Sequence, residues 1–262
     1  MSSQAHRLGA KAFLLKEMVN RDIRARYAGS GLGVAWAFAQ PVLWVLLFTA
    51  VFGVVLRVPV EPGFANFPEF LMAGLLPWMA FSEAISRSSS VLTDNASMVK
   101  KTVFPLETLV LSVVVAAVVN QGIGLAIYAV YVALLGHLSL PWLLLALPAL
   151  VLQMAIAFGL GCLAATVTVF VRDAAHAIGI ALQVLFYATP IIYPSSLVPE
   201  RFRPILRANP MTHLTEWYRD AFTLHALPDA ASVLYVAAFA AVAVALGAAL
   251  FARARPHFAD LI

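Results

Sequence analysis

Charged side chains that could bind an anionic group gather near the N-terminus of this chain. Residues 7–27 carry six Lys and Arg, and on a helical wheel the apolar side chains lie opposite Arg21 and Arg24. This pattern predicts an amphipathic helix in a membrane interface, where basic side chains attract anionic lipid head groups. An ordinary basic flank of a membrane span is the alternative. We assign Arg21, Arg24 and Arg26 to a head-group interface.

A second pair of ionisable side chains, Glu83 and Arg87, lies within an apolar part of the chain. Four positions separate them, in the order that favours an ion pair along one helical face. The segment around them, Ser82–Ser90, is too polar to face lipid, so we expect it to face protein or a wet cavity. Both residues join the predicted head-group interface.

Aromatic side chains recur about every four residues in the first long apolar segment. This spacing predicts a stripe along one side of a helix. The stripe fits either helix–helix packing with an interfacial Trp or a lining for a sugar chain, since rings stack on sugar faces. Two aromatic residues of a later apolar segment are added to it. The candidate lining consists of Trp36, Gln40, Trp44, Phe48, Phe52, Phe186 and Tyr187.

The motifs of common catalytic machinery are absent from the sequence. It contains no Gly-x-x-x-x-Gly-Lys-Ser/Thr phosphate loop, which argues against ATP hydrolysis by this chain. It has no Gly-x-Ser-x-Gly motif, its six His are scattered, and Cys162 is its one cysteine. An ion-coupled carrier would place ionisable groups near the membrane midplane, where this chain has few. We therefore expect a transport protein, without cofactor or metal, that a separate subunit powers.

The composition is that of a polytopic membrane protein. Of 262 residues, 62% are hydrophobic and 11% charged, and the mean hydropathy is +0.90. Phe104–Phe170 contains one carboxylate, Glu107, and no Lys or Arg, whereas about a quarter of an ordinary soluble chain is charged. The net charge of +4 fits basic cytoplasmic loops better than nucleic-acid binding.

Long apolar runs predict an all-α fold with six membrane-spanning helices, because a barrel would alternate over segments of about ten residues. The spans lie at about 34–56, 69–92, 106–135, 141–170, 177–193 and 230–251. Most Lys and Arg fall on the side of the N-terminus, which predicts that both termini are cytoplasmic. We expect no cleavable signal peptide, because residues 1–33 carry charges throughout and no apolar core of the right length. The chain forms one domain, 1–262, divided into 1–33 (interface helix and turn), 34–193 (five spans), 194–229 (external helices) and 230–262 (last span and tail).

Isolated polar and small residues inside the spans predict how the helices pack. Asn120, Gln121 and Gln153 are more typical of interhelical hydrogen bonds than of ligand binding. Gly122 and Gly124 in one span, and Gly159 and Gly161 in the next, permit close approach of two backbones.

Two loops carry signals for short helices. Asn209-Pro210 places a capping side chain before a proline at the first helical position in the external segment. Capping residues and a closing Lys-Lys pair frame a short helix in the cytoplasmic loop after the second span. The residues of this cytoplasmic loop that we single out are Asp94, Asn95, Met98, Val99, Lys100 and Lys101.

Several short motifs follow one another in order along most of the chain. They are Arg21–Tyr27, Gly31–Trp36, Gln40-Pro41, Gly74–Trp78, Ser82–Ala84, Asp94–Ala96, Lys100-Lys101, Phe104-Pro105, Asn209–His213 and Glu216–Arg219. Together, over about residues 8–250, they resemble the type 2 ABC permeases that export polysaccharides. Members of that family move lipid-linked O-antigen, capsule or teichoic acid chains.

The resemblance implies a role for each segment. Residues 7–27 correspond to an interface helix, and about 94–101 to a coupling helix that docks on an ATPase subunit. Two external gate helices correspond to about 197–207 and 211–224. The gate residues assigned in this way are Arg201, Arg207, Trp217, Tyr218 and Arg219.

The resemblance also implies an assembly. Two permeases and two ATPases form the working unit in the bacterial cytoplasmic (inner) membrane, with ATP and Mg bound by the ATPases. The lipid-linked glycan passes between the permeases, which contact membrane lipids and no nucleic acid. Alternatives are an ABC permease for another lipid or a drug, a membrane-embedded transferase and a secondary transporter.

Overall fold

A computed structural model describes residues 13–24, 31, 33–101 and 105–262, which form helices and turns with no strand among them. Residues 13–24 are helical. The further elements are η1 (Gly33–Ala35), α2 (Trp36–Phe48), η2 (Thr49–Val55), α3 (Phe67–Asp94), α4 (Ala96–Lys101), α5 (Glu107–Leu134), α6 (Leu140–Leu143), α7 (Ala146–Phe170), α8 (Ala174–Tyr187), η3 (Ser195–Leu197), η4 (Glu200–Phe202), α9 (Arg203–Arg207), α10 (Pro210–Arg219), η5 (Asp220–Leu224) and α11 (Ala230–Leu261).

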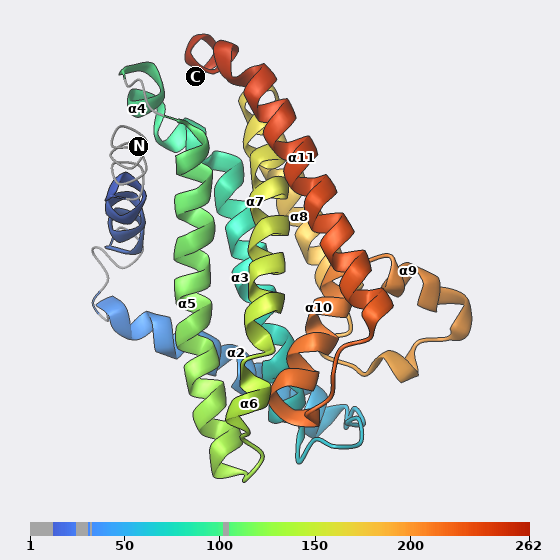
Figure 1. Cartoon of the computed structure of the whole chain (residues 1–262). Coiled ribbons are helices and arrows are strands. Elements are labelled where there is room, and N and C mark those ends of the chain that lie inside the picture. The colour runs from blue at the N-terminus through green and yellow to red at the C-terminus, as the bar shows by residue number, and fades with distance from the viewer. Residues whose placement is uncertain (1–12, 25–30, 32, 102–104) are drawn as a thin grey trace, which may run out of the picture.

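The helix α3 lies in the middle of the bundle, in contact with α2, α5, α7, α8 and α10 (Figure 1). It begins where Asn66 Oδ1 accepts a hydrogen bond from the Glu69 backbone N–H at 3.0 Å, with Pro68 in its first turn. In its polar half, Ser88 and Ser89 are buried. The prediction that this half faces protein or a cavity is confirmed.

Four helical segments in the described residues are long and apolar enough to cross a membrane: Trp36–Val55, Glu107–Leu134, Leu140–Phe170 and Ala230–Leu261. Six spans were predicted, so this prediction is met in part. The helix α3 has 28 residues, but its polar half lowers its hydropathy. The helix α8 has 14 residues, which at 1.5 Å per residue is about 21 Å, short of a hydrocarbon core of roughly 30 Å.

Prolines explain where two predicted spans differ from the structure. The fifth was predicted to reach residue 193, but α8 ends at Tyr187 and a buried irregular segment with Pro190 follows. The fourth is divided into α6 and α7. Pro148 has no N–H to donate to the carbonyl of Leu144, which instead accepts from Leu147 at 3.1 Å in a tighter turn.

The last helix is longer than predicted. The residues after 251 were expected to form a tail. They instead continue α11 to Leu261, with Pro256 inside the helix. Phe251 and Phe258 are fully buried and pack edge to face, 5.1 Å between ring centroids. Their burial anchors this end of α11 against α4, α5 and α7, beside Val99 and Leu106.

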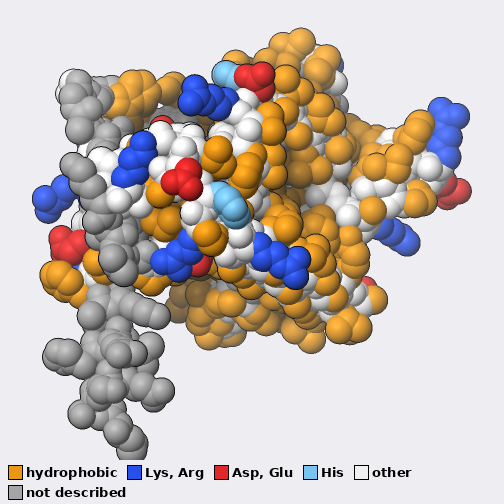
Figure 2. Space-filling view, turned by 90° about the horizontal axis from the view of Figure 1, so that it is seen from above, with side chains coloured by type: hydrophobic (Ala, Val, Ile, Leu, Met, Phe, Trp, Pro, Cys, Tyr) orange, Lys and Arg blue, Asp and Glu red, His pale blue; other side chains and the backbone are white. Residues whose placement is uncertain are grey.

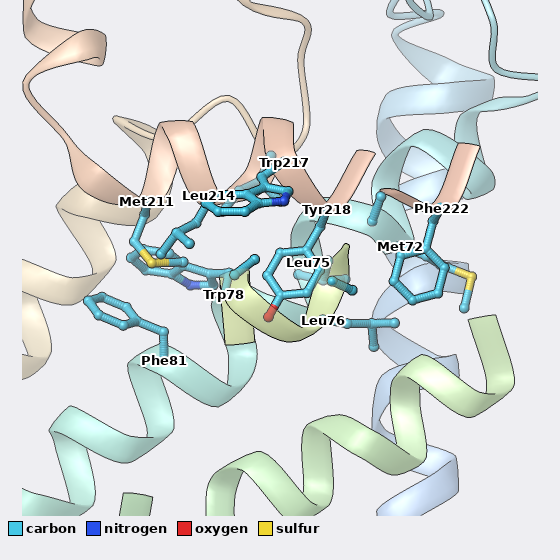
Figure 3. Close-up of a cluster of buried hydrophobic side chains, with 14 of the residues drawn as sticks. Met72, Leu75, Leu76, Trp78, Phe81, Met211, Leu214, Trp217, Tyr218 and Phe222 are labelled. Atoms are coloured by element: carbon cyan, nitrogen blue, oxygen red, sulfur yellow. The ribbon is translucent and has the colours of Figure 1, made fainter. Parts of the chain in front are cut away.

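The helix α10 packs directly on α3. Met211, Leu214, Trp217 and Tyr218 lie over Leu75, Trp78 and Phe81 in one buried cluster (Figure 3). Asn209 caps α10, and its Oδ1 accepts from the Met211 N–H at 3.0 Å. The predicted start of this helix is confirmed.

The helix α2 crosses behind α5 at a steep angle to the upright helices (Figure 1). In the apolar segment Trp36–Val55, only Ala37 and Pro41 are buried among the described residues. Leu43, Leu46 and Val54 are more than half exposed. This apolar surface requires lipid or another protein chain to cover it.

The most extensive helix–helix contact, between α7 and α11, depends on two glycines. A Cβ at Gly159 would lie 2.6 Å from the backbone N of Val244, and one at Gly247 would lie 3.0 Å from Cα of Gly159. No side chain fits at either position without separating the helices. The predicted close approach is confirmed at Gly159 and is wrong at Gly122, where no atom lies within 4 Å of an added Cβ.

We expect Gly247→Val to destabilise the protein by about 1–3 kcal/mol, because overpacking forces α7 and α11 apart. Gly122→Val, on an open face of α5 with no atom within 4 Å of its Cβ, is the matched control. Thermal unfolding of the purified protein in detergent measures both. Equal losses at the two positions would contradict this packing.

Candidate functional site: an aromatic groove and its two flanks

A groove of about 630 Å³ lies between α2, α3, α5 and α8. It contains five of the seven predicted lining residues. These five are Gln40, Trp44, Phe48, Phe186 and Tyr187. Trp36 and Phe52 lie outside the groove. Trp36 is 40% exposed elsewhere on α2, and Phe52 packs against Phe48 at 5.9 Å between ring centroids.

The aromatic rings form a continuous wall across three helices. Phe48 of α2 stacks on Trp44 at 5.5 Å and contacts Phe186 of α8 at 5.6 Å. Phe186 also contacts Tyr187 at 5.2 Å and Trp78 of α3 at 5.8 Å. Residues far apart in the sequence thus present ring faces to one space.

Polar side chains complete the lining. Carboxylate, hydroxyl and amide groups come from α3, α5 and α8, opposite or between the rings. They belong to Ser82, Glu83, Ser86, Asn120, Gln121 and Gln183. A lining of ring faces with scattered hydrogen-bonding groups suits a ligand that is rich in hydroxyls and has apolar faces.

A buried hydrogen-bond network supports the groove from behind. Gln153 Nε2 of α7 donates to Gln121 Oε1 of α5 at 2.8 Å and to the Pro77 carbonyl of α3 at 3.1 Å. The Tyr218 hydroxyl of α10 donates to Gln153 Oε1 at 2.9 Å. The network joins four helices, and the predicted interhelical role of Gln121 and Gln153 is confirmed.

Two predicted head-group residues hold the N-terminal helix instead of facing solvent freely. Arg87 donates from Nη1 to Asp22 Oδ2 at 2.8 Å, and its Nη2 forms a second, closer contact with Asp22 Oδ1. Arg87 also lies 3.5 Å from Glu83. Arg21 donates to Asn95 Oδ1 at 2.9 Å. Of the other two predicted residues, Arg24 is exposed and Arg26 lies outside the described residues.

The short helix predicted in the cytoplasmic loop is present as α4 and is joined to α3 through Asn95; its coupling role stays a prediction. The Asn95 Nδ2 donates to the Val91 carbonyl at 2.8 Å, and Met98 Sδ accepts from Arg21 at 3.0 Å. Val99 is buried in the bundle, so it does not form the exposed contact expected of it.

Two further residues of this loop, Asp94 and Lys100, are exposed. The backbone of Lys101 ends α4, and its side chain lies outside the described residues. Figure 2 views this end of the molecule, where charged side chains are set among apolar ones.

The predicted gate residues divide into two groups. Arg201 and Arg207 are exposed, whereas Trp217, Tyr218 and Arg219 are buried in α10. Arg219 donates to the Pro190 carbonyl at 2.8 Å and lies over the ring of Phe70. Burial lowers the pKa of Arg219 to about 10. The sequence around Arg219 does not indicate that this charged side chain is fully buried.

Sequence reasoning missed Trp78 and Gln183 as groove residues. Trp78 follows Pro77 in the Gly-Leu-Leu-Pro-Trp motif, which indicates the family likeness but does not indicate that Trp78 lines a groove. Gln183 is a polar residue in the apolar fifth segment, a signal like that of Gln121 and Gln153, and could have been included.

An apolar helical bundle with an open groove and a short helix joined to its central helix is typical of the membrane part of a transporter. The sequence profile described as ABC-2 type transporter matches residues 14–223. The chain therefore belongs to the ABC-2 type transporter family; it is a multi-pass membrane transport permease and is not itself an enzyme.

Curated relatives share this chain nearly end to end. It is 34% identical over 252 residues to the O-antigen export system permease protein RfbA of Myxococcus xanthus, covering 95% of each chain. It is 29% identical over 260 residues to the protein of the same name from Klebsiella pneumoniae, covering 98% of each. It is 25% identical over 244 residues to the polysialic acid transport protein KpsM of Escherichia coli, covering 88% of this chain and 89% of KpsM.

We expect the Arg87–Asp22 contact to be worth about 1–3 kcal/mol, since both side chains are partly buried and the contact is bidentate. Asp22→Asn and Arg87→Gln should each destabilise the protein, and the double variant should lose less than their sum. Unfolding in mixed detergent micelles measures this cycle. Arg24→Gln, an exposed control on the same helix, should change little. Strict additivity of the Asp22 and Arg87 effects would refute the coupling.

A pH dependence follows from Asp220, whose pKa is raised to about 6, chiefly by burial and then by nearby Glu216 and Glu61. The folded chain then binds a proton more tightly than the unfolded chain, whose Asp titrates near 3.9. This group therefore opposes folding above pH 6 and ceases to do so as the pH falls towards 4. Asp220→Asn should raise the free energy of unfolding by about 1 kcal/mol at pH 7.5, a value that allows for solvent screening of this partly exposed side chain. At pH 4.5 the same substitution should change the free energy of unfolding little. Thermal unfolding at both pH values tests this; a gain that is the same at both would exclude it.

Proposed function

We propose that this chain is the membrane subunit of an ATP-driven exporter that moves a lipid-linked polysaccharide across a bacterial cytoplasmic membrane. The aromatic groove is the observation that carries the proposal. It combines ring faces with amides, hydroxyls and a carboxylate in an otherwise apolar bundle. The names of the relatives, which concern O-antigen export and polysialic acid transport, support the same substrate class.

The groove suits a sliding sugar chain. Aromatic faces such as Trp44 and Phe186 stack on the apolar faces of sugar rings, and Gln40, Asn120 and Gln183 can exchange hydrogen bonds with hydroxyls as the chain advances. Contacts of this kind are individually weak and repeat along a polymer. The ligand is therefore guided without being held at one position.

A second copy of the chain is the proposed cover for the apolar surface of α2, which the chain itself leaves exposed. Two copies placed with their α2 helices and grooves towards one another would enclose a path between them. Isologous pairing of this kind is the commonest form of homo-oligomer. The remaining apolar surface would face membrane lipids.

ATP-driven movement is proposed to enter through α4. Membership in the ABC-2 family implies an ABC ATPase partner, and two ATPases that bind ATP and Mg would serve two permeases. The exposed Asp94 and Lys100 are available for such a contact. Because α4 is joined to α3 through Asn95, a push on α4 is delivered to the helix that carries Trp78, Ser82 and Glu83 in the groove.

In the orientation that we propose, α4 and both termini lie in the cytoplasm, and η3, η4, α9 and α10 lie on the external side, where they would act as gate helices. The excess of Lys and Arg on the α4 side supports this orientation. The anionic head group of the substrate would meet Arg24 first. Arg21 and Arg87 would contribute their charge while holding the N-terminal helix to α3 and α4.

We expect Trp44→Ala combined with Phe186→Ala to reduce polymer export at least tenfold, because two ring faces of the groove are removed. Surface polysaccharide is measured in cells whose own permease gene has been replaced by the variant. Phe170→Ala, an exposed residue at the end of α7 that lies outside both the groove and the apolar surface of α2, is the control and should export normally.

Co-purification with the ATPase distinguishes loss of transport from loss of assembly. The groove variant should retain the ATPase, since its substitutions are remote from α4. Normal export by that variant would refute the groove as the path. Loss of the ATPase as well would show that the substitutions disturb the assembly and would remove the support for a guiding role.

A further inference from the structure

A second cavity, of about 680 Å³, lies at the end of the chain remote from α4. Its walls are η3, α9, α10 and the first two turns of α11. Together η3, η4 and α9 form an arm, residues 195–207, that projects sideways from the bundle at the level where α11 begins (Figure 1). The cavity shares no lining residue with the groove proposed as the transport path, although three of its walls belong to the proposed gate helices.

The cavity walls are fixed by specific hydrogen bonds. His213 Nε2 lies 2.8 Å from the Arg207 carbonyl and its Nδ1 lies 3.0 Å from Ser232 Oγ. Because a carbonyl only accepts, Nε2 carries the hydrogen and donates it. Tyr235 of α11 donates to the Ala208 carbonyl at 2.6 Å. The last carbonyls of α9 are thus satisfied by α10 and α11, which holds the arm in place.

The cavity has a basic part and an acidic part. Arg203 and Arg207 come from the arm, and Glu216 and Asp229 come from α10 and the start of α11. Within the described residues, the Arg207 guanidinium makes no hydrogen bond or ion pair. Arg203 donates from Nε to the Val198 carbonyl at 3.3 Å, and its Nη1 forms a loose ion pair with exposed Glu200 at 3.7 Å. Two cationic groups are therefore available to a ligand.

An unpartnered hydroxyl in the cavity lining points independently to a ligand. Thr212 is 3% exposed, and its Oγ1 finds no hydrogen-bond partner among the described residues. A buried polar atom without a partner is costly, by about 1–3 kcal/mol. A ligand oxygen beside Thr212 would remove that cost.

Apolar side chains beside the cavity indicate that lipid lies next to it. Leu197 and Ile205 of the arm are 52% and 61% exposed, and Leu234 in the first turns of α11 is 71% exposed. The segment Ala230–Leu261 is apolar enough to span a membrane, so its first turns mark a membrane boundary. A head group in the cavity could therefore have its acyl chains in the bilayer.

We propose that this cavity binds the head group of a zwitterionic phospholipid, with its phosphate at Arg203, Arg207 and Thr212 and its ammonium at Glu216 and Asp229. The negative phosphate would then lie beside the two arginines, and the positive ammonium beside the two carboxylates. A diphosphate head group would bring further negative charge towards the two carboxylates, and an uncharged sugar would leave both guanidinium groups without a counter-ion. The bound lipid would tie the arm to α10, which packs on α3.

The test uses the full chain, purified and stripped of lipid in mild detergent. Phosphatidylethanolamine, phosphatidylglycerol or the isolated soluble head group, glycerophosphoethanolamine, is added, and retained lipid is counted by native mass spectrometry. We expect phosphatidylethanolamine to be retained at least tenfold better than phosphatidylglycerol. If the soluble head group alone is retained, the cavity binds it without any contribution from the acyl chains, which supports the proposal.

Variants assign the binding to the two parts of the cavity. Arg203→Ala with Arg207→Ala should abolish retention of phosphatidylethanolamine, whereas Arg201→Ala, an exposed arginine on the same arm that does not line the cavity, should preserve it. Glu216→Gln should shift the preference towards phosphatidylglycerol, a change that misfolding would not produce.

Three outcomes would overturn the proposal. They are equal retention of the two lipids by the unsubstituted chain, retention unaffected by the double arginine variant, and an unchanged preference after Glu216→Gln. Because the Glu216 variant is judged by selectivity, it decides the question even if the arginine variant fails to fold.

Discussion

The structure depends on one constraint: the second half of α3 cannot face lipid. Ser82–Ser90 contains five serines and the Glu83–Arg87 pair, and exposing such groups to hydrocarbon would cost several kcal/mol. The helix is therefore placed in the centre of the bundle, and the other helices pack around it. Where they leave a space beside α3, the groove forms, and its polar lining comes in part from the same serines and Glu83.

In such a bundle the helices cannot be held by hydrophobic burial alone, because lipid is as apolar as the helix surfaces. Close backbone contact and buried polar bonds supply the specificity. Gly159 and Gly247 bring α7 and α11 together, and Gln121, Gln153 and Tyr218 join α5, α7 and α10. The same polar groups lie directly behind the groove, so its shape is set by the bonds that hold the bundle.

Local signals in the sequence predicted what depends on local physics. The cap at Asn209-Pro210, the central position of the polar half of α3 and the interhelical role of Gln153 follow from patterns within a few residues. Contacts between distant segments did not follow. Nothing near Asp22 indicates that it pairs with Arg87, and nothing near Arg219 indicates that backbone carbonyls and Phe70 surround it. The break before α7 could have been read from Pro148, but hydropathy averages over it.

Pro77 lies inside α3, the central helix of the bundle, and marks a weak point in it. Proline removes the hydrogen bond to the carbonyl of residue 73 and weakens the helix at that turn. The Pro77 carbonyl is bound by Gln153 of α7, and the groove residues Leu75, Trp78 and Ser82 lie on either side of it. The helix α10 packs over Leu75, Trp78 and Phe81, on both sides of Pro77, and the end of α3 continues through Asn95 to α4. If α4 transmits ATP-driven movement as proposed, the turn at Pro77 is where α3 can bend most easily, and the nearby side chains of Leu75, Trp78 and Ser82 line the groove.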